Sequence, residues 1–89
     1  MRIYHEPVTV QFRDAPAQFI WRGRLLRVLS VQTLTREATS WWRHPERAGE
    51  PLEREVWRVE AESGRAWRGI YELARTAGED DWQLQGVED

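Results

Sequence analysis

Side chains that could act in catalysis or bind a metal are few and widely spaced in this chain. There are two histidines, His5 and His44, and no cysteine. Neither histidine belongs to a spacing typical of zinc sites. The acidic run GEDD at 78–81 lacks the ligand spacing of a calcium loop and indicates an acidic turn between strands. The sequence therefore predicts no metal and no cofactor.

Nucleophilic catalysis also lacks a recognisable arrangement. The serines Ser30, Ser40 and Ser63 stand outside any GxSxG-like pattern. His5 and Glu6 could form a base and its orienting acid, but neighbouring residues of a strand point to opposite faces. We therefore expect a protein that is not an enzyme, unless folding gathers a histidine with carboxylates distant in the sequence.

Tryptophan beside arginine is the informative combination. The stretch SWWR places Trp41 next to Trp42 and Arg43. An exposed large aromatic forgoes a burial worth roughly 1.5 to 3 kcal/mol, a loss tolerated more readily where something binds. Exposed Trp with Arg occurs in protein hot spots and on surfaces that stack single-stranded nucleic acid. Alternatively, the two rings cap the open end of the fold and Arg43 pairs with a glutamate.

A second combination is the tripeptide WRG, which occurs at 21–23 and again at 67–69. We expect Trp21 to anchor the core at the end of a strand and Gly23 to let the chain reverse, which leaves Arg22 and Arg24 as candidate contacts. The residues that follow the two copies show little agreement. Chance recurrence therefore explains the repeat better than a duplication does.

The charge of the chain is moderate but uneven. Its net charge is -2, with thirteen arginines and no lysine; residues 1–45 carry +4 and residues 46–89 carry -6. Phosphate-driven binding needs a basic surface, which only the N-terminal half could supply. We therefore expect a protein-interaction module, with single-stranded nucleic-acid binding by the same residues as the alternative. The charge asymmetry also allows self-association.

Alternating apolar and polar residues predict strands over much of the chain. The expected strands are 7–12, 17–21, 24–35, 54–62, 65–73 and 82–87. They predict an all-β or mainly β fold, either a small curled antiparallel sheet or an SH3-like barrel of five to six strands. Segment 54–62 also fits a helix, but neighbouring strands that need a partner favour the strand. Trp67, Gly69, Tyr71 and Leu73 alternate on one face of their strand.

The sequence also predicts two connections and one irregularity within a strand. Arginine is unfavourable at positive φ, so WRGR predicts a three-residue type of turn with Gly23 left-handed, rather than a two-residue type I′ turn. The run 24–35 is apolar on both faces, which predicts a bulge near Leu29 or Ser30. Residues 36–52 contain two prolines and several charges, and they predict a long, partly mobile connection.

With 89 residues the chain predicts one domain, 1–89, whose core depends on side-chain burial because no disulfide can form. Its six tryptophans are the largest contributors to such a core. No apolar run approaches the roughly 18 residues that span a bilayer, and the N-terminal residues lack the apolar segment of a signal peptide. We expect a cytoplasmic protein without a membrane partner.

Five blocks of the sequence together resemble a family of small uncharacterised bacterial domains. The blocks are EPVTV, PAQFIWRGRLLRV, SWWRHP, EREVWRVEA and DWQL, and they span nearly the whole chain. Leu26 stands where the family pattern has tyrosine. The resemblance implies no established activity, but genes of the family are often near those of error-prone translesion DNA polymerases. It therefore implies an accessory role in DNA-damage tolerance.

Overall fold

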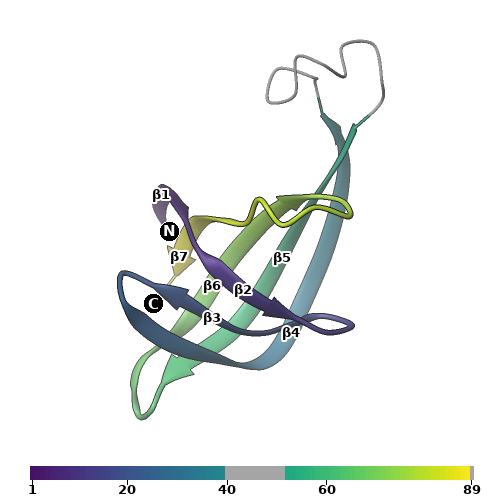
Figure 1. Cartoon of the computed structure of the whole chain (residues 1–89). Helices are drawn as coiled ribbons and strands as arrows, with labels where there is room; N and C mark the ends of the chain where they lie inside the picture. The colour runs from purple at the N-terminus through teal and green to yellow at the C-terminus, as the bar shows by residue number, and fades with distance from the viewer. Residues whose placement is uncertain (40–51, 89) are drawn as a thin grey trace.

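The computed structural model of the chain describes residues 1–39 and 52–88, whose strands form one antiparallel sheet (Figure 1). The seven strands are β1 (Arg2–Pro7), β2 (Thr9–Phe12), β3 (Pro16–Trp21), β4 (Arg24–Thr39), β5 (Leu52–Ser63), β6 (Ala66–Thr76) and β7 (Gln83–Glu88). Their order across the sheet is β1-β7-β6-β5-β4-β3-β2. The predicted all-β class and curled antiparallel sheet are confirmed, with seven strands in place of five to six.

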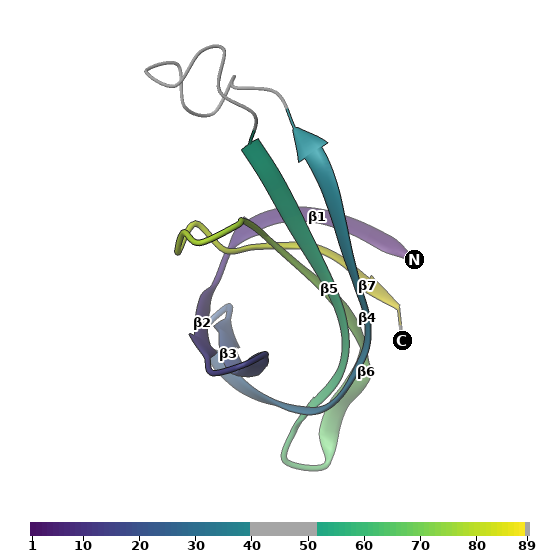
Figure 2. The ribbon, with the colours of Figure 1, turned by 90° about the vertical axis from the view of Figure 1, so that its right-hand side faces the viewer.

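The additional strand comes from the N-terminus. The segment expected as one strand over 7–12 starts earlier and is divided at Val8: β1 pairs with β7, whereas β2 pairs with β3. The Val8 amide instead donates to the carbonyl of Trp82, at 3.2 Å. Because β1 and β2 are the two outer strands and follow each other in the chain, the sheet curls round into a half-barrel (Figure 2).

The concave side of this sheet holds the core. Four large aromatic residues, Phe19, Trp21, Trp57 and Trp82, are almost fully buried there together with Tyr71. Aliphatic side chains from four strands fill the remaining space: Leu26, Val59, Leu73, Leu84 and Val87. The Tyr71 ring packs edge-on against Phe19 and Trp21, with centroids 5.5 and 6.2 Å apart. The prediction that Trp21 anchors the core is confirmed.

Strand β4 bends where the sequence predicted a bulge. Its pairing with β5 shifts between Val28 and Ser30, and again between Val31 and Thr33. Each shift inserts one extra residue into β4 and bends the strand. Leu26 is buried and Val28 packs against the core, whereas Leu29, Val31 and Leu34 are exposed. The strand reading of 54–62 is also confirmed, because these residues lie within β5.

The predicted connection 36–52 is wrong at both ends. Residues 36–39 continue β4 and Leu52 begins β5, with pairs from Arg36–Glu55 to Thr39–Leu52. Cross-strand pairing overrides the polar composition of 36–39, since a long hairpin satisfies their backbone groups. The remainder of the predicted connection, 40–51, lies outside the described residues.

The turn between β3 and β4 also differs from the prediction. Trp21 pairs directly with Arg24, which leaves a two-residue turn with φ of 53° at Arg22 and 74° at Gly23. Positive φ at both central residues defines a type I′ turn, whose twist matches that of the strands it joins. The match between the twist of a type I′ turn and that of the two strands thus outweighs the steric cost of positive φ at Arg22.

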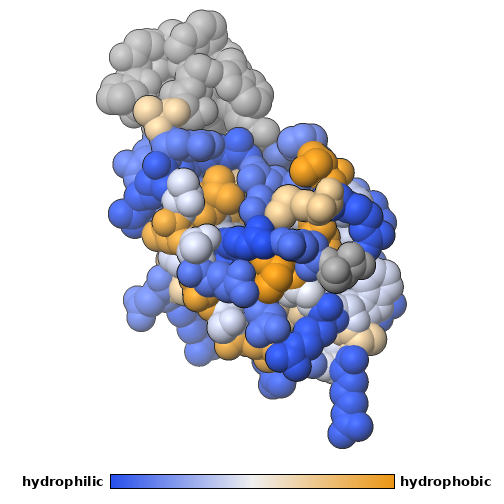
Figure 3. Space-filling model, turned by 180° about the vertical axis from the view of Figure 1, so that it is seen from behind, coloured by the Kyte–Doolittle hydropathy of each residue, from blue (hydrophilic) through white to orange (hydrophobic). Residues whose placement is uncertain are grey.

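The surface is mainly hydrophilic, with apolar side chains in small separate patches on the face seen in Figure 3. No helix among the described residues is long and apolar enough to cross a membrane.

Candidate functional site

The two WRG tripeptides meet at one end of the half-barrel. The first forms the β3–β4 turn and the second begins β6, directly after the β5–β6 turn. In Figure 1 both turns lie at the lower left, away from the upper ends of β4 and β5. Residues from both tripeptides, with others from β1, β6 and β7, line a hollow of about 380 Å³: Arg2, Tyr4, Trp21, Arg22, Trp67, Arg68, Tyr71 and Val87.

The floor and the rim of this hollow differ in chemistry. Trp21, Tyr71 and Val87 are buried side chains of the core and form an aromatic and aliphatic floor. The rim is basic and exposed, with the arginines Arg2, Arg22 and Arg68. A ligand that suits both parts has a flat apolar group and a negative charge. The volume lies near the lower limit of small-ligand sites.

Trp67 is the exposed aromatic of the rim. The residue is 52% exposed, and its backbone has φ of 61°, which is rare for a bulky residue. The cause is a bulge: between the pairs Ala61–Gly69 and Ser63–Ala66, β5 has one residue where β6 has two, Trp67 and Arg68. Left-handed backbone at a non-glycine residue costs roughly 1 to 3 kcal/mol and is concentrated at functional sites.

Two contacts hold Trp67 in place. The Tyr71 hydroxyl donates a hydrogen bond to the Trp67 carbonyl at 2.5 Å. The guanidinium carbon of Arg24 lies 4.6 Å from the centre of the Trp67 ring, within the range of a cation–π contact. Arg24 forms no ion pair with any residue of the described part of the chain. One face of an exposed indole is therefore already supported by a cation.

Arg22, at the opposite WRG, is held by a carboxylate. Glu6 Oε1 accepts hydrogen bonds from Trp21 Nε1 at 2.9 Å and Arg22 Nε at 3.0 Å, and Glu6 Oε2 accepts one from Arg22 Nη2 at 2.7 Å. These hydrogen bonds, first that from Arg22 and then that from Trp21, hold the pKa of Glu6 below its ordinary value. The same arginine also lies over the rings of Trp21 and Tyr4, at 4.8 and 5.2 Å.

The residues predicted as contacts are only partly within the structure. Arg22 and Arg24 lie at the hollow, where Arg22 lines it and Arg24 supports Trp67. Trp41, Trp42 and Arg43 lie outside the described residues. The alternation predicted for Trp67, Gly69, Tyr71 and Leu73 is interrupted by the bulge at Trp67 and Arg68, and Trp67 is exposed whereas Tyr71 and Leu73 are buried.

Sequence reasoning missed Trp67, Arg68, Arg2 and Tyr4 as members of the site. The repeated WRG was the available signal, and its interpretation as chance recurrence concerned ancestry alone. The structure brings the two copies to one hollow although neighbouring strands do not carry them. A repeated tripeptide can therefore be a shared site without being a duplicated unit.

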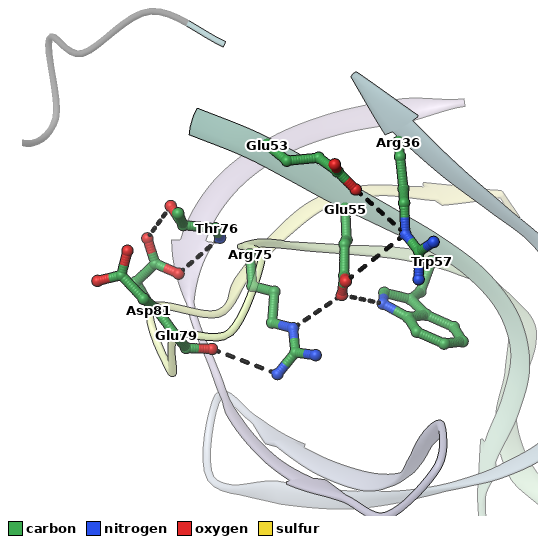
Figure 4. A network of polar contacts seen from close by, with 8 residues as sticks. All are labelled: Arg36, Glu53, Glu55, Trp57, Arg75, Thr76, Glu79 and Asp81. Carbon is green, nitrogen blue, oxygen red and sulfur yellow. Dashed lines mark hydrogen bonds and ion pairs between the residues drawn. The ribbon is translucent and has the colours of Figure 1, made fainter. Parts of the chain in front are cut away.

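A second polar cluster lies on the concave side near the other end of β5 (Figure 4). Glu55 is buried and accepts hydrogen bonds from Arg75 Nε at 2.9 Å and Trp57 Nε1 at 3.1 Å, with Arg36 Nε 3.8 Å away. Burial raises the pKa of Glu55, but the hydrogen bonds from Arg75 and Trp57 outweigh it and the pKa is lowered overall. Arg75 also covers the Phe12 ring, at 4.2 Å.

This cluster closes the core rather than offering a binding site. The carboxylate of Glu55 has partners on both oxygens, and Arg75 is shared between Glu55, Phe12 and the Glu79 carbonyl. Within the described ranges, no group of three or more His, Cys, Asp or Glu residues could hold a metal ion. The hollow between the WRG tripeptides is therefore the candidate site.

Comparison with known proteins gives a family and no activity. A model of the family "Domain of unknown function (DUF6504)" matches residues 1–89, so the chain belongs to this family. No curated protein and no solved structure matches the chain.

Proposed function

We propose that this member of a domain family of unknown function is a non-catalytic module that binds single-stranded nucleic acid in the hollow between its two WRG tripeptides. The observation that carries the proposal is the exposed, left-handed Trp67 beside a rim of arginines. A base can stack on Trp67 while guanidinium groups bind the phosphates. Base–aromatic stacking of this kind contributes about 1 to 3 kcal/mol per base.

The local charge supports this ligand more strongly than the net charge does. The rim contains Arg2, Arg22 and Arg68, and Arg24 lies against Trp67. Two carboxylates offset part of this charge, Glu6 at Arg22 and Glu60 at Arg68, the latter at 3.2 Å. Since exposed charges are screened beyond about 8 to 10 Å at physiological salt, acidic residues elsewhere on the chain have little effect here.

A single strand fits the hollow better than a duplex does. Stacking on Trp67 needs the face of a base, and bases in a duplex expose only their edges. Recognition of this type tolerates any base, because each has a π face. In a cell, such a module would assist enzymes that work on exposed single strands, as in DNA-damage tolerance or repair.

The direct test is the anisotropy of a labelled single-stranded oligonucleotide titrated with protein at low salt. We expect saturable binding by the natural chain and a loss of at least tenfold in affinity for Trp67→Gly. Leu25→Ala is a matched control, because Leu25 is 51% exposed and does not line the hollow. Equal affinities for the natural chain and Trp67→Gly, or no binding at low salt, would refute the proposal.

A protein partner is the second candidate, and a separate observation favours it. Strand β3 pairs with β4 only as far as Arg27, and no other described strand covers that side of β4 beyond this residue. Leu29, Val31 and Leu34 are more than one third exposed along this segment. An open strand edge of this kind can accept an extended segment of another protein.

Nucleic-acid binding at the hollow and protein binding at the β4 edge should be lost in different variants. Proline in place of Thr35 removes a backbone N–H from β4, so the variant should lose binding of an extended protein segment at the β4 edge. If the variant still folds, its oligonucleotide binding should be unchanged. Trp67→Gly should weaken oligonucleotide binding at least tenfold and leave the β4 edge intact. The two sites can therefore be tested independently.

A further inference from the structure

We propose that Glu6 is an internal competitor for phosphate: its carboxylate occupies the Arg22 guanidinium, and a nucleic-acid phosphate must displace it to bind there. This inference rests on the proposed function and concerns the affinity of the same site. It makes Glu6 a residue that limits affinity, although its side chain does not line the hollow.

The geometry of the Glu6 contacts is that of a bound anion. Arg22 donates from Nε and Nη2 to the two oxygens of Glu6, at 3.0 and 2.7 Å. Two parallel donors of one guanidinium match a phosphate as well as a carboxylate. The indole N–H of Trp21 adds a third donor to Oε1 at 2.9 Å. The chain thus builds a three-donor anion site and fills it with its own side chain.

The ion pair between Arg22 and Glu6 can readily be exchanged for one between Arg22 and a phosphate, because both side chains are accessible to solvent. The Arg22 side chain is 58% exposed and that of Glu6 is 33% exposed. Ion pairs in such positions are weak because water and salt compete with them. The hydrogen bonds also keep the pKa of Glu6 low, so Glu6 is charged at neutral pH and competes throughout the range in which nucleic acid is bound.

The backbone at Arg22 indicates that the arginine is not kept for the turn alone. A type I′ turn favours asparagine or glycine at this position, and Arg22 has φ of 53°. The side chain that accepts this conformation reaches Glu6 and the rings of Trp21 and Tyr4 while lining the hollow. These contacts hold the guanidinium at the rim, ready to pair with a different anion.

The test compares Glu6→Gln with the natural chain in oligonucleotide binding at several salt concentrations. Glutamine keeps an oxygen for the Trp21 N–H and removes the competing charge. We expect affinity to rise two- to fivefold, the range that an exposed ion pair allows. We also expect the salt dependence to steepen by roughly 0.7 in log K against log salt, since Arg22 then neutralises one more phosphate of a single strand.

Two further variants make the result specific. Asp80→Asn removes the same charge from the turn after β6, at the other end of that strand from Trp67, and should leave affinity within twofold. In the double variant Glu6→Gln with Arg22→Gln, the gain should disappear. An unchanged or weaker affinity of folded Glu6→Gln, or an equal gain from Asp80→Asn, would overturn the inference.

The outcomes separate this inference from the proposed function. If Trp67→Gly loses binding while Glu6→Gln leaves it unchanged, the hollow binds nucleic acid but Glu6 does not compete there. If the natural chain and Glu6→Gln both fail to bind at low salt, the proposed function and the role of Glu6 are both wrong. Thermal unfolding of each variant shows that a loss of binding is not a loss of fold.

Discussion

Trp21 and Trp67 line the same hollow although their strands, β3 and β6, are separated in the sheet by β4 and β5. The curl of the sheet brings them together. Trp21 is 5% exposed and belongs to the core, whereas Trp67 is 52% exposed. The site therefore combines one ring fixed by the fold with one ring available to a ligand.

The left-handed backbone at Trp67 predicts an unusual order of stability among its variants. Trp67→Gly should be more stable than Trp67→Ala by about 1 kcal/mol, because glycine adopts φ of 61° without the steric cost that alanine incurs. Urea unfolding of the two variants measures the difference. Alanine as the more stable variant would show that the backbone at this position is not left-handed.

Replacing Arg22 by asparagine should leave the free energy of unfolding within about 1 kcal/mol of the natural value. Asparagine suits the first central position of a type I′ turn, and this gain offsets the loss of contacts made by an exposed side chain. Chemical denaturation measures the change. A larger destabilisation would mean that the Arg22–Glu6 pair is needed for folding.

Glu55 should make the free energy of unfolding depend on pH in the acidic range. Its pKa is lowered by folding from the ordinary value of 4.5, so its contribution is complete above that pH and is lost as the pH falls through the lower, folded-state pKa. Glu55→Gln should cost about 2 to 3 kcal/mol at pH 7, since Arg75 loses its buried charged partner. The difference in the free energy of unfolding between Glu55→Gln and the natural chain should narrow as the pH falls below the ordinary value of 4.5 and through the lower pKa of folded Glu55.

The neighbouring Glu53 provides the control for this prediction. It is exposed and pairs with Arg36 at 3.3 Å, so Glu53→Gln should change stability by no more than about 0.5 kcal/mol. Melting temperatures across the pH range measure both variants. A difference in stability between Glu55→Gln and the natural chain that stays constant to the lowest pH at which both remain folded would contradict the role of the carboxylate charge.

Oligonucleotide binding should depend moderately on salt. If Arg2 and Arg24 each neutralise one phosphate while Glu6 offsets Arg22 and Glu60 offsets Arg68, log K should fall with log salt at a slope of roughly -1.4. Anisotropy titrations at a series of salt concentrations give this slope. A slope near zero would mean that phosphates are not bound at the rim.

How far the sequence predicts this molecule depends on whether a feature is local. The alternation of apolar and polar residues and the two-faced run of β4 are sufficient for the fold class, most of the strands and the bulge near Leu29, because these features depend on neighbouring residues. The division of 7–12 at Val8 is not local, because β1 and β2 pair with strands distant in the sequence. The type I′ turn at Arg22 was missed because arginine propensity was weighed without the twist of the hairpin.

The hollow was harder to predict from the sequence than the strands were, because it depends on contacts between distant parts of the chain. The exposure of Trp67 follows from a bulge against Glu62, and its proximity to Arg24 follows from the curl of the whole sheet. Neither can be read from alternation along one strand, which placed Trp67 on the same face as Tyr71. Arg22 and Arg24 can be named from the sequence because they stand in a local pattern around Gly23, and their role as contacts stays a prediction.

The indole N–H signals in NMR spectra of the protein test most directly whether the hollow between the WRG tripeptides binds single-stranded nucleic acid. The chain has six tryptophans, and the absence of a signal in Trp67→Gly assigns Trp67. On titration with a short oligonucleotide, the signals of Trp67 and Trp21 should shift together and saturate, while that of the buried Trp82 stays in place. An unmoved Trp67 signal, or shifts confined to Trp41 and Trp42, would contradict binding at the hollow.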